Sequence, residues 1–273
     1  MTSTDPRFGV LLSLGVAVLW ALGSVVHAAA GRRIGAFGTL LWRSAFAPPL
    51  LFGTAFALHS PWPSGASAAW FAASGLVGVC LGDFLYYSAL VSLGPRRTVQ
   101  FTTLAPLFGA SCGWLFLGEA LDARALLGAA LVLGASASAV WIERRALRPG
   151  SGSPAPTGSE PGRVTARGVL AAVGAAAMMG GAAVMVRQAY RAGPPADPFA
   201  AAAIRVGAAS AAIWLARCFV RRPRPLGPML ADRAAMVRVG LGTLVGPFLG
   251  MLGFIGALKV LEAGLVTTLV SLA

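Results

Sequence analysis

The chain has 273 residues, of which 57% are hydrophobic and only 11% are charged, and its mean hydropathy is +0.75. Soluble domains carry about 25% charged residues, so a water-facing surface is excluded for most of this chain and the bilayer is its expected partner. The formal net charge of +13 does not indicate nucleic-acid binding, because the arginines form short clusters between apolar runs. The three cysteines, Cys80, Cys112 and Cys218, show neither a disulfide framework nor metal-ligand spacing, and we expect no metal and no cofactor.

Apolar runs in the first part of the chain predict five membrane spans. They cover residues 8–30, 37–58, 68–93, 98–117 and 123–142. About 20 apolar residues cross the bilayer core as a helix, and each run reaches that length. The first run is no cleaved signal peptide, because it is too long and another span follows at once. The pair Pro48-Pro49 predicts a kink in the second span, and Pro106 predicts a helix break in the fourth.

A segment of different composition follows the fifth run. Residues 143–166 are rich in Gly, Ser and Pro and predict a flexible linker. Three further spans, at 168–190, 199–220 and 234–258, and a final apolar run from 263 to 273 come after it. We therefore divide the chain into a first repeat (1–145), a linker (146–166) and a second repeat (167–273). The final run would give roughly 16 Å of helix against a core of about 30 Å, so we expect the natural gene to continue for about one and a half more helices.

The second set of spans repeats the first. Matching residues are separated by 159 at Gly9 and Gly168, by 162 at Arg43 and Arg205, by 164 at Gly78 and Gly242, and by 168 at Ala89 and Ala257. Offsets that grow slowly indicate a duplication with small insertions, and the offset of 164 places Pro247 opposite Asp83. Because five spans per copy is an odd number, the copies enter the membrane from opposite sides. This predicts an all-α integral membrane protein with a five-plus-five inverted repeat, its second repeat ending within a ninth helix, and a binding site near the midplane.

Three segments resemble a known family. They read ALVSLG, then TTLAPLFGASCGWLFLGEAL, then LLGAALVLGA, and the most characteristic part is Leu104, Pro106 and the LFLGE of residues 115–119. Together with the duplication they resemble the EamA family of the drug/metabolite transporter superfamily, over essentially the whole chain. The resemblance implies ten membrane helices around a central substrate cavity, and export or exchange of small metabolites, often amino acids. It implies no particular substrate.

Polar residues inside the spans are the candidates for substrate binding or coupling, because such groups are expensive in lipid. Asp83 is the only acid deep in an apolar run, and we predict that it binds a substrate amine or carries a proton. An acid that only joins two helices is the alternative. The candidate partners are Tyr86 and Tyr87 on the same helix face, as hydrogen-bond donors, and Arg43 as a counter-charge. The other candidates are Gln100, Trp20 and Arg205; for both arginines the alternative is snorkelling to the headgroups, and for Trp20 it is anchoring at the interface.

Two other patterns indicate other chemistry or none. Residues 109–113, GASCG, fit the G-x-S-x-G nucleophile elbow of serine hydrolases, but both histidines precede it and the pattern lies in an apolar run, so packing is favoured. Glu119 and Asp122 lie in a predicted loop, where they are expected to cap the following helix.

We therefore predict a transporter and not an enzyme, working by alternating access. The alternatives are an intramembrane serine hydrolase-like enzyme, such as a rhomboid-like protease, and a non-transporting scaffold subunit. The expected location is a bacterial inner (plasma) membrane. The expected partners are lipid, a small-molecule substrate and, for coupling, protons, but no nucleic acid; a homodimer is left open.

The arginine clusters also predict an orientation. They follow the odd-numbered spans, at residues 32–33, 96–97, 144–163 and 221–224. The positive-inside rule then places these loops in the cytoplasm and the N-terminus outside. The family resemblance implies the reverse. We favour the charge count, and both orientations stay open.

Overall fold

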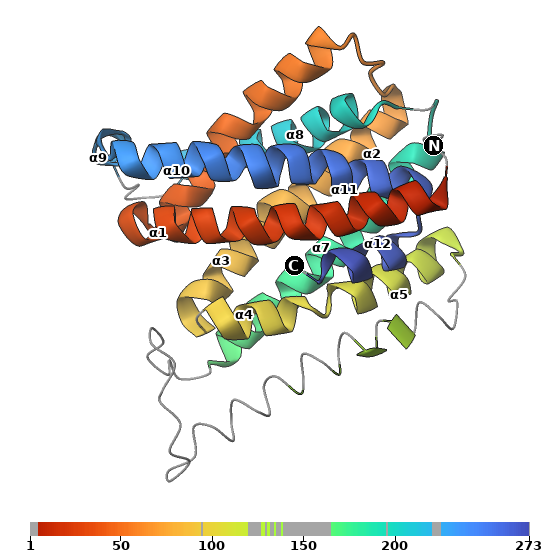
Figure 1. Ribbon diagram of the computed structural model, residues 1–273, viewed down its shortest axis with the longest axis horizontal. Coiled ribbons are helices and arrows are strands. Elements are labelled where there is room, and N and C mark those ends of the chain that lie inside the picture. The colour runs from red at the N-terminus through yellow and green to blue at the C-terminus, as the bar shows by residue number, and fades with distance from the viewer. Residues whose placement is uncertain are drawn as a thin grey trace.

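The computed structural model describes residues 5–93, 95–119, 165–194, 196–219 and 225–272, together with six residues between 127 and 138. Every regular element in these ranges is a helix (Figure 1). The predicted fifth span and the linker lie largely outside the described residues. By length and hydropathy, five described helical segments could cross a membrane: Pro6–Gly35, Gly65–Ala89, Ala166–Arg191, Pro198–Cys218 and Arg233–Val260. The chain is therefore an all-helical, multi-pass membrane protein.

The first two predicted spans form one long helix, α1 (Pro6–Ala57), that is interrupted at a single residue. Gly35 has φ 81° and ψ 159°, a conformation that glycine adopts without a steric penalty. The first predicted span, residues 8–30, therefore ends about five residues too early, because the helical segment continues to Gly35. Pro48 and Pro49 lie inside the second part of α1, where the backbone dihedrals remain helical.

The third predicted span is continuous, whereas the fourth is broken. The third consists of α2 (Gly65–Gly75), a π-helical segment η1 (Leu76–Leu81) and α3 (Gly82–Leu93). The fourth consists of α4 (Pro95–Thr102) and α5 (Ala105–Leu117), and Pro106 stands in the first turn of α5. A proline is tolerated there because its missing N–H would have no helical partner.

The second half of the described chain follows the same plan. It contains α7 (Ala166–Arg191), α8 (Pro198–Cys218), a short α9 (Leu226–Ala231), α10 (Arg233–Thr243), π-helical η2 (Leu244–Gly250), α11 (Met251–Val260) and α12 (Ala263–Val270). The helix α9 was not expected. Both π-helical segments occur in the middle of the corresponding span, one in each half.

Two close helix contacts, one in each half of the chain, use matching positions. The first part of α1 lies along α10, η2 and α11, and α7 lies along η1 and α3 (Figure 1). A Cβ added to Gly23 would be 3.3 Å from the backbone nitrogen of Gly246, and one added to Gly78 would be 2.6 Å from the Cβ of Ala182. The matched contacts are Gly9–Leu261 with Gly168–Leu93, Trp20–Gly250 with Met179–Gly82, and Gly23–Gly246 with Ala182–Gly78.

These paired contacts correct the register of the third span. They relate α1 to α7 by 159 residues and η1–α3 to η2–α11 by 168, and not by 164. Small residues recur every four positions in both copies, so a shift of one helical turn matches them almost equally well in the sequence. With the offset of 168, the residue opposite Asp83 is Met251, and the assignment of Pro247 is wrong.

Candidate functional site

A part-buried ion pair joins α1 to α3. Asp83 is the second residue of α3, and Arg43 lies in the second part of α1. Arg43 Nη2 donates a hydrogen bond to Asp83 Oδ2, and the two side chains are 17% and 15% exposed. A charge at membrane depth needs such a partner, because an isolated one costs at least about 2.5–3.5 kcal/mol on insertion scales. Arg43 thus lies where a counter-charge for Asp83 was expected.

The two tyrosines lie beside this pair but do not bind the carboxylate. The rings of Tyr86 and Tyr87 meet edge to face, with centroids 5.7 Å apart and an angle of 83° between the planes. Within the described part of the chain, no hydrogen bond joins either phenol to Asp83. Tyr87 instead packs on the cluster of Leu40, Leu41 and Ile213. The tyrosines therefore form an aromatic wall of the site, and the expected hydrogen bonds to the acid are absent from this conformation.

Arg205, the repeat mate of Arg43, lies in α8 with only 4% of its surface exposed. Its Nε and Nη1 are buried and make no hydrogen bond with any described residue. The guanidinium carbon lies 5.8 Å from the ring centroid of Phe254, and a Cβ on Gly78 would come within 2.9 Å of Nη2. The charge of Arg205, like that of Arg43, acts on Asp83. Burial this deep excludes snorkelling to the headgroups for Arg205.

Other buried polar atoms without a described partner lie on four helices. They are His27 Nε2 and Trp42 Nε1 on α1, Tyr190 Oη on α7, Ser210 Oγ on α8 and Thr243 Oγ1 at the end of α10. Each unsatisfied buried group costs about 1–3 kcal/mol. Native proteins carry few such groups, and bound water or a ligand commonly satisfies them. These helices therefore enclose more hydrogen-bonding capacity than the described residues use.

The remaining candidates are placed differently. Trp20 stacks on Phe254, with ring centroids 5.4 Å apart, so it reaches the residue that also lies under Arg205. Gln100 lies half-buried on α4, and its backbone carbonyl accepts a hydrogen bond of 2.6 Å from Thr103 Oγ1. No hydrogen bond or ion pair joins the Gln100 side chain to another described residue. Trp20 and Arg205 thus share Phe254 as a neighbour, and Gln100 has no described partner in the site.

A second buried charge cluster was missed in the sequence. Glu119, 7% exposed, follows α5 and binds two arginines of α7: its Oε1 lies 3.0 Å from Arg187 Nε and 3.5 Å from Arg191 Nη2. Its Oε2 accepts a hydrogen bond of 3.2 Å from the backbone N–H of Ala263, at the start of α12. Arg187 also donates to the carbonyl of Leu258 in α11. Glu119 therefore satisfies the first backbone N–H of α12. Asp122 and the start of the helix that both acids were expected to cap lie outside the described residues.

The GASCG segment belongs to helix packing. It lies inside α5 and not at a strand-to-helix turn, which a nucleophile elbow requires. A Cβ on Gly109 would lie 2.8 Å from Thr267 Oγ1, and one on Gly113 would lie 2.7 Å from Glu119 Oε2. The two glycines therefore let α12 and the Glu119 carboxylate approach α5 closely.

Part of this chain matches a known protein family. Residues 7–141 match the model of the EamA-like transporter family. This part of the chain belongs to the EamA-like transporter family. The match confirms the resemblance seen in the sequence, and EamA-like membership indicates a membrane transporter of the drug/metabolite superfamily. The search of curated proteins gave no match.

The fold of this EamA-like chain is shared with solved structures. One of them, described only as "Crystal structure of protein", has a TM-score of 0.64 and is 21% identical, over 96% of this chain and 83% of the other. At this identity the likeness shows the fold alone. It extends across both halves of the chain, whereas the family model matches the first half.

Proposed function

We propose that this protein carries a small metabolite, such as an amino acid, across a bacterial inner membrane by alternating access, with Asp83 as the group that couples substrate or protons to movement. The observation that carries the proposal is the buried Arg43–Asp83 pair between α1 and α3. A buried pair contributes little to stability compared with apolar packing, so its presence in a lipid-facing bundle favours a functional role.

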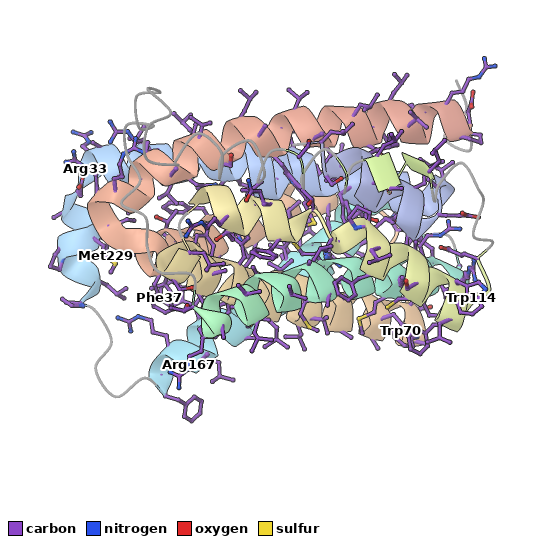
Figure 2. All side chains as sticks on the ribbon, turned by 90° about the horizontal axis from the view of Figure 1, so that it is seen from below. Arg33, Phe37, Trp70, Trp114, Arg167 and Met229 are labelled. Carbon is purple, nitrogen blue, oxygen red and sulfur yellow. The ribbon has the colours of Figure 1, made fainter. Side chains whose placement is uncertain are left out.

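Two observations support an inverted repeat as the basis of the movement. Matching contacts occur between α1 and η2–α11 and between α7 and η1–α3. Figure 2 shows Arg33, near the end of the first part of α1, and Arg167, near the start of α7, toward the same end of the molecule, with Trp70 and Trp114 at the other. The first part of α1 and α7 thus run in opposite directions, which supports an inverted repeat of the kind found in transporters whose halves rock about a central site.

Substrate binding or protonation can break the Arg43–Asp83 ion pair. In the described conformation Arg43 occupies one oxygen of Asp83. A substrate ammonium group competes with Arg43 for the carboxylate, and a proton removes the negative charge that holds Arg43. Either event releases the bond between α1 and α3, and a ligand shifts a conformational equilibrium by the difference in its affinity for the two states.

The Glu119 cluster supplies the closed end in this proposal. It binds α5 to α7 and to the start of α12 near Trp114, at the end opposite Arg33 (Figure 2). Alternating access needs one end held shut while the other is open. The shared carboxylate at Glu119 is suited to this because its loss frees three helix contacts together.

Flux into vesicles tests the proposal. The purified protein is reconstituted into proteoliposomes, and a panel of labelled amino acids, hydroxy acids, sugars and amines is screened by counterflow. We expect saturable uptake of at least one compound, and loss of that uptake in Asp83→Asn. Uptake of the whole panel at the rate of protein-free vesicles would refute transport of small metabolites.

A further inference from the structure

The two repeat-related arginines have different surroundings. Arg43 pairs with Asp83, and Tyr86 and Tyr87 follow this acid by one turn on α3. With the offset of 168 fixed by the helix contacts, these three residues correspond to Met251, Phe254 and Ile255 of the second copy. Each polar partner of the first copy is thus replaced by an apolar residue in the second. The second copy therefore has the arginine without a matching acid.

Arg205 is consequently a buried cation with hydrogen-bond donors that no described residue accepts. Two of its guanidinium nitrogens have no partner in the described part of the chain, and its side chain is 4% exposed. Gly78 leaves room for the guanidinium, because a Cβ there would be 2.9 Å from Nη2. A charged group in lipid that lacks a protein partner usually marks a substrate or ion pathway.

The charges identify the missing partner. Arg43, Asp83 and Arg205 together carry one net positive charge, so one negative charge from outside the protein neutralises the site. The planar fork of an arginine fits the two oxygens of a carboxylate. A phosphate monoester, which carries nearly two negative charges near pH 7, would leave the site negative.

We propose that Arg205 is a substrate-binding residue that holds a carboxylate, and hence that the transported metabolite is a carboxylic acid. The inference rests on the proposed transport function and narrows its substrate class. An amino acid would then place its carboxylate at Arg205 and its amine toward Asp83, in competition with Arg43.

Binding of acetate, the smallest probe with a suitable carboxylate and methyl group, tests the site without transport. The thermal stability of the detergent-purified protein is measured with acetate and with acetamide at equal ionic strength, in wild type, Arg205→Met and Arg167→Met. Arg167 is exposed at the start of α7 and serves as the matched control. We expect acetate to stabilise wild type and Arg167→Met but not Arg205→Met, and acetamide to stabilise none. Equal effects of acetate on Arg205→Met and wild type, or no effect of acetate on wild type, would overturn the proposal.

A second variant tests the site by adding a carboxylate from the protein itself. Met251→Asp restores the acid that the second copy lacks, and Met251→Asn is its uncharged control. We expect Met251→Asp to be at least as stable as Met251→Asn, to lose the acetate effect, and to reduce flux of any substrate found about a hundredfold, as loss of a buried charge partner does. Undiminished acetate stabilisation in Met251→Asp would contradict the assignment of Arg205.

The outcomes separate the two claims. Acetate binding through Arg205 in a protein that moves no panel compound would uphold the anion site and refute transport. Saturable flux of a compound without a carboxylate, or of an amide at the rate of its parent acid, would uphold transport and refute the substrate class.

Discussion

Replacing Asp83 by Asn removes the negative charge from the central ion pair and leaves its shape. Arg43 then remains charged between α1 and α3, and its side chain is only 17% exposed. Removing one partner of a buried pair typically costs about 3–5 kcal/mol. The Asn oxygen still accepts a charge-assisted hydrogen bond from the Arg43 guanidinium, which offsets part of this cost. We therefore expect a loss of about 2 kcal/mol in folding stability.

This loss is large enough to measure. For a chain of this size, 1 kcal/mol shifts the midpoint of thermal unfolding by about 2–4 °C, so Asp83→Asn should unfold about 4–8 °C below wild type. The midpoint is read from the monodisperse fraction that survives heating in detergent. Counterflow in proteoliposomes, assayed well below the midpoint, then reports activity of the folded protein.

A double variant separates the structural role of the pair from its functional role. Replacing both partners of a buried pair with apolar residues of similar size is often neutral or stabilising, so Arg43→Met/Asp83→Leu should unfold near the wild-type temperature. We expect it to transport nothing, because the coupling carboxylate is gone. Wild-type flux in the double variant, or in Asp83→Asn across the pH range, would show that the acid only joins two helices.

Three further expectations follow from single contacts. Glu119→Gln should speed hydrogen exchange at the first turn of α12, because an amide accepts the hydrogen bond from the Ala263 N–H more weakly than a carboxylate does. Unchanged exchange would contradict the capping of α12 by Glu119. Gly23→Leu should lower stability by about 1–3 kcal/mol through overpacking against Gly246, whereas Gly15→Leu, with open space around it, should not; equal thermal midpoints would refute the contact. Hydrogen bonds from Arg33 and from a backbone N–H hold the pKa of Asp232 below its usual value of 3.8. Its contribution to stability is therefore present above pH 3.8 and is lost as the pH falls toward the lower folded-state pKa; Asp232→Asn should lack this acid dependence, and an identical pH profile would argue against the pair.

The helices were largely predictable from the sequence, whereas their register was not. Long apolar runs specify membrane helices because every backbone group must be satisfied within lipid. The break at Gly35 was misplaced because the nearby arginines look like a helix end, and only the positive φ of that glycine reveals the real one. The offset between Gly78 and Gly246 required the contacts themselves, since a four-residue pattern of small side chains is unchanged by a shift of one turn.

The site was predictable where burial alone decides, and unpredictable where distant residues meet. Asp83 needed a counter-charge at its depth, and Arg43 was available on a neighbouring helix. Met251, and not an acid, occupies the position that matches Asp83 in the second copy, and the wrong register concealed this. Glu119 and Arg187 are 68 residues apart, and no local pattern links them. The one sequence signal for this cluster was Arg187, which lies near the C-terminal end of the apolar run of α7.

Counterflow of one identified substrate shows whether the protein transports it and whether transport requires the Asp83 carboxylate. Proteoliposomes containing wild type, Asp83→Asn or the exposed control Arg167→Met are prepared in parallel and matched for protein content. We expect saturable flux for wild type and Arg167→Met, and flux in Asp83→Asn no faster than in protein-free vesicles. Saturable flux in Asp83→Asn equal to that of wild type would contradict it.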